Sequence, residues 1–111
     1  MTKMQNDSEY VTVKANYFKT GLHAYAGELT LGNRGLVFDA QTMGKITIPY
    51  VQMRVVWVQV VLRHFYRGII VEAPDGRQFH FVTSRTRQLL HVLNHYLPTG
   101  TVRHYRAKTK R

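Results

Sequence analysis

The segment VQMRVVWVQVVL, residues 51–62, limits what this chain can fold into more than any other feature. Arg54 and Arg63 enclose only eight residues, whereas a helix that spans a bilayer needs roughly 17 to 25. The apolar residues do not recur at intervals of three and four, which argues against an amphipathic helix. Valine and Trp57 are typical of a pleated strand, because branched and aromatic side chains pack well there. The segment therefore predicts one strand, or two strands that meet at a bend near Trp57.

From Val55 onward, both alternating sets of residues in this strand are apolar. Such a strand is covered on both faces, whereas an antiparallel strand with one wet face alternates between apolar and polar residues. We expect the interior of a barrel to cover one face, and a helix, a tail or another subunit to cover the other. One face is therefore a candidate partner site, and a homo-oligomer is one way to cover it.

Strand patterns fill most of the remaining sequence. Alternation of apolar and polar residues predicts strands in VTVKANY (11–17), in KITIP (45–49) and in two hairpins. The first hairpin is GELTLGNRGLVFDA (27–40) with the turn GNRG, and the second is GIIVEAPDGRQFHFV (68–82) with the turn PDG. Together with the opening segment, these patterns predict six or seven antiparallel strands.

Only the segment SRTRQLLHVLNHYLP has a helical period. Its apolar residues fall on one stripe and Pro98 ends it, so we expect one helix over about residues 84–97. One amphipathic helix after a run of strands predicts a mainly β fold, with a single strongly bent antiparallel sheet whose open end the helix plugs. This domain spans residues 11–98 and lies between a flexible N-terminal segment (1–10) and a basic tail (99–111).

Three segments followed by the helix carry a resemblance to known proteins: GELTLGNRGLVF, ITIPYVQMRVVWV and GIIVEAPDGRQFHFV. In this order they resemble the pleckstrin-homology-like and GRAM-type barrel. More narrowly, the order of YAGELTLG, IPY, DGRQFHFVTS, YLP and VRHY between about Val11 and Tyr105 resembles the bacterial family called domain of unknown function 956. The resemblance implies an accessory regulator that docks on mannose-class phosphotransferase-system sugar transporters. The connection LRHFYRG is tighter than the family pattern implies.

Basic residues are concentrated in the second half of the chain. The net charge is +10, yet residues 1–40 have a net charge of zero, and residues 85–111 contain seven basic residues and no carboxylate. This distribution favours an acidic partner, although a solvated tail is the alternative. The chain has no cysteine and no apolar leader, so we expect a cytoplasmic protein that can also lie at the inner face of the cell membrane.

Patterns that would indicate catalysis or metal binding are weak. The six carboxylates are scattered singly, and no histidine is spaced with a serine and an acid for nucleophilic catalysis. His91 and His95 are four residues apart on the predicted helix and are a weak candidate pair for zinc, but no third ligand lies near them in sequence. We therefore expect a binding or regulatory module that is not an enzyme and has no cofactor.

Three classes of partner compete for this module. Transporter subunits fit the aromatic and basic residues, since Trp, Tyr and Arg are enriched among interface anchors. An anionic membrane surface fits the segment RHYRAKTKR, where each cation near the surface contributes roughly 1 kcal/mol. Nucleic acid is the least expected, because the predicted helix presents no basic recognition face. The candidate binding residues are Trp57, Phe65, Tyr66, Arg67, Arg103, Tyr105, Arg106, Lys108, Lys110 and Arg111.

Overall fold

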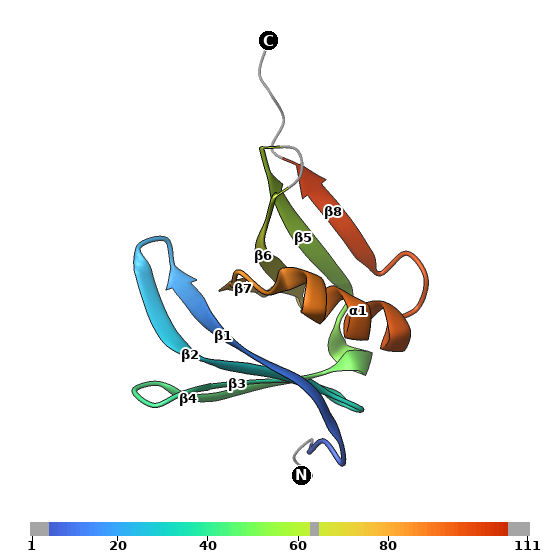
Figure 1. Cartoon of the computed structure of the whole chain (residues 1–111), viewed down its shortest axis with the longest axis horizontal. Helices are drawn as coiled ribbons and strands as arrows, with labels where there is room; N and C mark the ends of the chain where they lie inside the picture. The colour runs from blue at the N-terminus through green and yellow to red at the C-terminus, as the bar shows by residue number, and fades with distance from the viewer. Residues whose placement is uncertain (1–4, 63–64, 107–111) are drawn as a thin grey trace.

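A computed structural model describes residues 5–62 and 65–106, which form one eight-stranded sheet and one α-helix. The strands lie in the order β4-β3-β2-β1-β7-β6-β5-β8 (Figure 1). The elements are β1 (Glu9–Thr20), β2 (His23–Gly32), β3 (Gly35–Ala40), β4 (Gly44–Pro49), the short 3₁₀ helix η1 (Tyr50–Gln52), β5 (Val55–Val61), β6 (Phe65–Glu72), β7 (Gln78–Val82), α1 (Thr86–Tyr96) and β8 (Val102–Arg106). The protein is mainly β, as the alternating patterns predicted.

Tight turns join neighbouring strands, and both predicted hairpins are present as β2–β3 and β6–β7. Gly44, which follows the β3–β4 turn, and Gly76, in the β6–β7 turn, have φ values of 98° and 92°. Glycine adopts this left-handed region without the clash that a Cβ atom causes. Turn chemistry therefore sets the antiparallel order of β1 to β4 and of β5 to β7.

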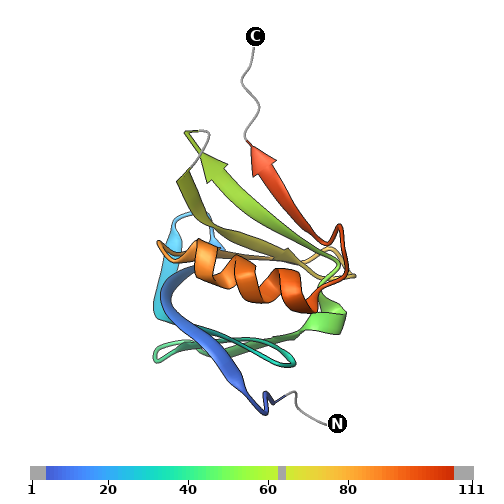
Figure 2. The same ribbon diagram turned by 45° about the vertical axis from the view of Figure 1, so that its right-hand side comes forward.

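The sheet curls around α1, which lies across its concave side (Figures 1 and 2). On the predicted apolar stripe of the helix, Leu89 and Leu93 are fully buried. The sheet contributes Phe38 and Phe81, which are also fully buried and have ring centroids 5.4 Å apart. Burial of each such side chain contributes about 1.5–3 kcal/mol, so this shared core of helix and sheet is a main source of stability.

The segment 51–62 forms a strand only from Val55 onward. Val51 lies in η1 and is 92% exposed, and β5 runs through Trp57 as one strand, so of the two alternatives the structure has the single strand, which begins at Val55. Val55 is 3% exposed and Val56 is fully buried, although they point to opposite faces of the sheet. The prediction that both faces of this strand are covered is therefore confirmed at its start.

Three features of the sheet differ from the sequence-based expectation. It has eight strands instead of six or seven, and it is mixed instead of wholly antiparallel. It is also not closed, because β4 and β8 are edge strands with no pairing between them in the described residues. The additional strand, β8, begins in the segment that was predicted to be a basic tail. Because α1 carries the chain back across the sheet, β8 runs parallel to β5.

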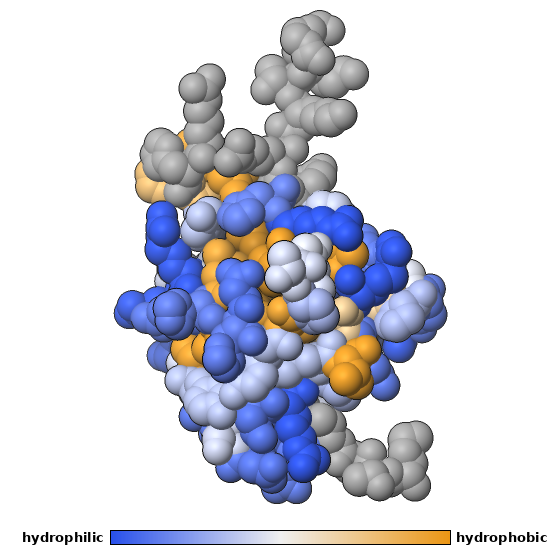
Figure 3. Space-filling view, turned by 90° about the vertical axis from the view of Figure 1, so that its right-hand side faces the viewer, coloured by the Kyte–Doolittle hydropathy of each residue, from blue (hydrophilic) through white to orange (hydrophobic). Residues whose placement is uncertain are grey.

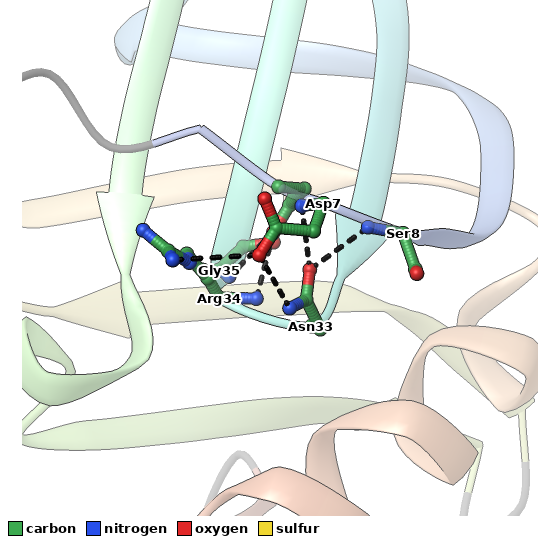
Figure 4. A network of polar contacts seen from close by, with 6 residues as sticks. Asp7, Ser8, Asn33, Arg34 and Gly35 are labelled. Carbon is green, nitrogen blue, oxygen red and sulfur yellow. Dashed lines mark hydrogen bonds and ion pairs between the residues drawn. The ribbon is translucent and has the colours of Figure 1, made fainter.

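The described part of the N-terminal segment contacts the β2–β3 turn (Figure 4). The Oδ1 atom of Asn33 accepts hydrogen bonds from the N–H groups of Asp7 and Ser8, at 2.8 and 3.0 Å. In return, Oδ1 of Asn6 accepts a hydrogen bond from the N–H of Arg34 at 2.7 Å. These side-chain bonds to the backbone hold the turn and the start of β1 together, within a segment that the sequence indicated to be flexible.

Candidate binding surface

The end of the β5–β6 hairpin exposes three apolar side chains. Val61 and Phe65 pair across the hairpin and are 40% and 55% exposed, and Leu62 beyond them is 77% exposed. Figure 3 shows hydrophobic surface at this end of the molecule, above hydrophilic side chains. The other large exposed apolar residues of the described chain, Leu22 among them, lie in separate places in the sequence and fold. Grouped apolar exposure of this kind indicates an interaction site more strongly than single residues do.

Leu62 also has an unusual backbone conformation. Its φ is 50°, and it is the one non-glycine residue with a positive φ in the described part of the chain. This left-handed conformation costs an L-residue roughly 1–2 kcal/mol, and asparagine or glycine would relieve it at a turn. Leu62 therefore lowers the stability of the turn while presenting its side chain to solvent. Strain of this kind concentrates at functional sites.

A cationic groove adjoins this exposed end. It has a volume of about 650 Å³ and is lined by Phe65, Tyr66 and residues 84–88. The guanidinium carbon of Arg87 lies 4.7 Å from the centroid of the Tyr66 ring, and the His104 ring lies 5.9 Å from it. The sequence has no carboxylate between Val55 and Val71 or after Asp75, so Glu72, at the end of β6 and bonded to Arg54, is the one carboxylate in the β5–β6 hairpin, α1 and β8.

Three described arginines surround this end. The pairing of β5 with β6 shifts register between Gln59 and Val60, and the exposed Arg67 lies opposite this β-bulge. The carbonyl of Arg67 accepts a hydrogen bond from the N–H of Thr83 at 3.0 Å. That bond brings the start of the helix, with the exposed Arg85 and Arg87, beside the hairpin. We call Val61, Leu62, Phe65 and these three arginines the hairpin-end surface. It combines an apolar tip with a positively charged border.

The outer face of β5 carries a second group of residues, centred on Trp57. The Arg103 guanidinium carbon lies 5.7 Å from the Trp57 ring centroid, and the indole Nε1 donates to Glu72 at 3.4 Å. Glu72 also accepts a hydrogen bond from Nε of Arg54 at 3.0 Å, and this bond is the main reason that the pKa of Glu72 is lowered. Arg77, on the other side of the β6–β7 turn, pairs with Asp75 and not with Glu72.

The predicted binding residues fall into separate groups. Trp57 and Arg103 lie together on the outer face of the sheet, and Phe65, Tyr66 and Arg67 lie at the end of the hairpin. Tyr105 and Arg106 have backbone positions in β8. The remaining predicted residues lie outside the described part of the chain, namely Lys108, Lys110 and Arg111.

Sequence reasoning missed Val61, Leu62, Arg85 and Arg87 as members of the surface. Val61 and Leu62 read as the end of a buried strand, although their position next to LRHFYRG indicated that they approach a turn. Arg85 and Arg87 precede the first leucine of the helix, and only the sheet topology brings them beside β6. The linear sequence carries no signal for that contact.

The described residues contain no group of three or more potential metal ligands. His91 and His95 are both exposed on α1, and the His95 ring packs edge-on against Tyr96 with centroids 4.7 Å apart. His80, on β7, is half-buried, and this burial lowers its pKa. Among the helices of the described chain, none is both long and apolar enough to cross a bilayer.

The chain matches no protein-family model, and a comparison with curated proteins finds no match. Among solved structures, it is similar to the crystal structure of the C-terminal domain of an unknown protein from Leishmania infantum. The two share 13% sequence identity with a TM-score of 0.69, over 80% of this chain and 83% of that one. This likeness supports the fold and carries no information on function.

Proposed function

We propose that this chain is a non-enzymatic binding module that attaches to an anionic membrane surface through the hairpin-end surface. The observation that carries the proposal is the exposed, left-handed Leu62 beside Val61 and Phe65, with arginines around them. An apolar tip inserts among lipid acyl chains, while cations next to it contact anionic headgroups. Stable attachment of a soluble domain generally needs both signals.

The expected contributions are comparable in size. Each arginine near an anionic surface contributes roughly 1 kcal/mol, so the three described ones contribute about 3 kcal/mol. Complete burial of a leucine or phenylalanine contributes about 1.5–3 kcal/mol. Since the electrostatic part weakens with salt and the apolar part does not, binding should fall with ionic strength to a residual level.

Vesicle sedimentation tests this proposal. The chain should bind phosphatidylcholine vesicles that contain phosphatidylserine and should bind pure phosphatidylcholine weakly. Exchange of Val61 and Phe65 for serine should weaken binding by about tenfold, because two apolar anchors are lost. Val51→Ser is the matched control, since Val51 is 92% exposed on η1, away from this surface. If the double variant binds like the control, the hairpin is not the membrane anchor.

Regulation of a mannose-class phosphotransferase-system transporter is the second proposed function, and it rests on the resemblance to the domain of unknown function 956. The strand order from β4 to β5 and the helix on the concave side support a pleckstrin-homology-like architecture as part of that proposal. Membrane attachment would place the chain beside such a partner. The exposed Arg103 beside Trp57 is a candidate contact of that docking.

A pull-down from detergent-solubilised bacterial membranes tests the transporter proposal. Transporter subunits should be recovered by the full chain and lost with Trp57→Ala. A variant in which Lys108, Lys110 and Arg111 are replaced by glutamine tests whether the charge of the tail is needed for this recovery. It leaves the sequence of β8 and of the surface around Trp57 unchanged. If nucleic acid is recovered in place of transporter subunits, and salt releases it whatever its base sequence, the basic residues act as a nonspecific anion-binding surface.

A further inference from the structure

The strand β8 forms one edge of the sheet, and only its pairing with β5 is present in the described residues. In Figure 2 it lies at the rim of the molecule, with no other element beyond it. Edge strands carry backbone N–H and C=O groups that another strand can pair with. This edge is separate from the apolar hairpin tip, so it is a different kind of surface.

The register of the ladder shows which backbone groups point outward. The N–H of Val56 donates to the carbonyl of Thr101 at 2.9 Å, and Val56 lies opposite Val102. In a parallel ladder, Arg103 then directs its N–H and C=O toward β5. Because these groups alternate along a strand, Val102 and His104 direct theirs to the open side. The edge therefore offers a donor and an acceptor at each of two positions.

The charge of this edge selects the kind of strand that can join it. Arg103 and His104 are exposed, and β8 contains two arginines and no carboxylate. A second copy of β8 would bring like charges together and is disfavoured. The other edge, β4, differs because it ends in Pro49, which has no N–H, and its Lys45 lies opposite Asp39.

We propose that β8 is a docking edge for an extended acidic segment of a partner protein, which adds to the sheet as a ninth strand. Backbone hydrogen bonds supply affinity, and carboxylates of the segment next to Arg103 supply selectivity. Basic residues on an edge strand also protect it against pairing with neutral or basic strands. The same basic residues attract an acidic segment. This inference does not depend on membrane attachment.

The probe is a short peptide of alternating valine and glutamate, compared with one of alternating valine and lysine, in solution without vesicles. The acidic peptide should bind and the basic one should not. Binding should slow hydrogen exchange at the amides of Val102 and His104, with less change in β4. Equal binding of both peptides, or binding of neither, would overturn the proposal.

Two variants separate charge from backbone pairing. Arg103→Glu should abolish binding of the acidic peptide and permit binding of the basic one. His104→Pro removes an outward N–H without removing a bond to β5, so acidic-peptide binding should weaken about tenfold. The fluorescence of Trp57, which lies opposite Arg103, reports whether β8 remains in place in each variant. If peptide binding survives His104→Pro unchanged in a folded chain, strand addition at this edge is wrong.

Discussion

Replacement of Leu62 by asparagine should make the protein more stable and a weaker membrane binder. At a φ of 50°, an L-residue is destabilised by roughly 1–2 kcal/mol, and asparagine tolerates this region better than leucine. The side chain is 77% exposed, so little packing is lost on replacement. We expect a gain of about 1 kcal/mol in the free energy of unfolding, which corresponds to roughly 4–8 °C in the melting temperature.

The same exposed side chain should contribute to binding of anionic vesicles. Complete burial of leucine contributes about 1.5–3 kcal/mol, and most of the Leu62 side chain is available for insertion. A loss of 1–2 kcal/mol from that contact would weaken vesicle binding by a factor of about 5–30. Stability and binding should therefore change in opposite directions in this one variant.

Thermal unfolding followed by circular dichroism and vesicle sedimentation measure the two effects. Leu22→Asn is the matched control, because Leu22 is fully exposed at the β1–β2 turn and has no positive φ. We expect neither property to change in the control. A lower melting temperature for Leu62→Asn would refute the strain argument. Unchanged vesicle binding would refute the assignment of Leu62 as an anchor.

Three further predictions concern the fold. Tyr50→Phe should lower the free energy of unfolding by about 1–3 kcal/mol in thermal melts, because the buried Tyr50 hydroxyl donates to the carbonyl of Gly32 at 2.7 Å. Burial raises the pKa of Tyr50. The stability that the neutral hydroxyl contributes is therefore present below the ordinary tyrosine pKa and should be lost as the pH rises above it, and this alkaline loss should be smaller in Tyr50→Phe. The pKa of Glu72 is lowered, so the stability that its carboxylate contributes should be present above the ordinary glutamate pKa and lost at more acidic pH. In Glu72→Gln, the free energy of unfolding should therefore depend less on pH in the acid range. Gly68→Ala should lower stability in urea titrations by about 1–3 kcal/mol or more, because the new Cβ would overlap the backbone of β7, whereas Gly21→Ala, in open space, should be neutral.

Local patterns in the sequence were sufficient for most of the fold. Alternation identified the strands of both hairpins, and the leucine spacing identified α1 to within two residues at its start. These signals are local, because each depends on residues that are near one another in the chain. Strand β8 was missed for the same reason. Its segment, VRHYR, is short and basic, and only the pairing with β5 makes it a strand.

The sequence by itself determined that the chain is a mainly β protein with one helix, positively charged in its second half, and that both faces of β5 are apolar at its start. Only the tertiary structure decided that Leu62 is exposed in a left-handed turn and that Arg85 and Arg87 adjoin the β5–β6 hairpin. It also decided that β8 forms an open edge. The physical reason is that composition and periodicity are properties of neighbouring residues, whereas exposure and electrostatic proximity depend on how distant strands pack together.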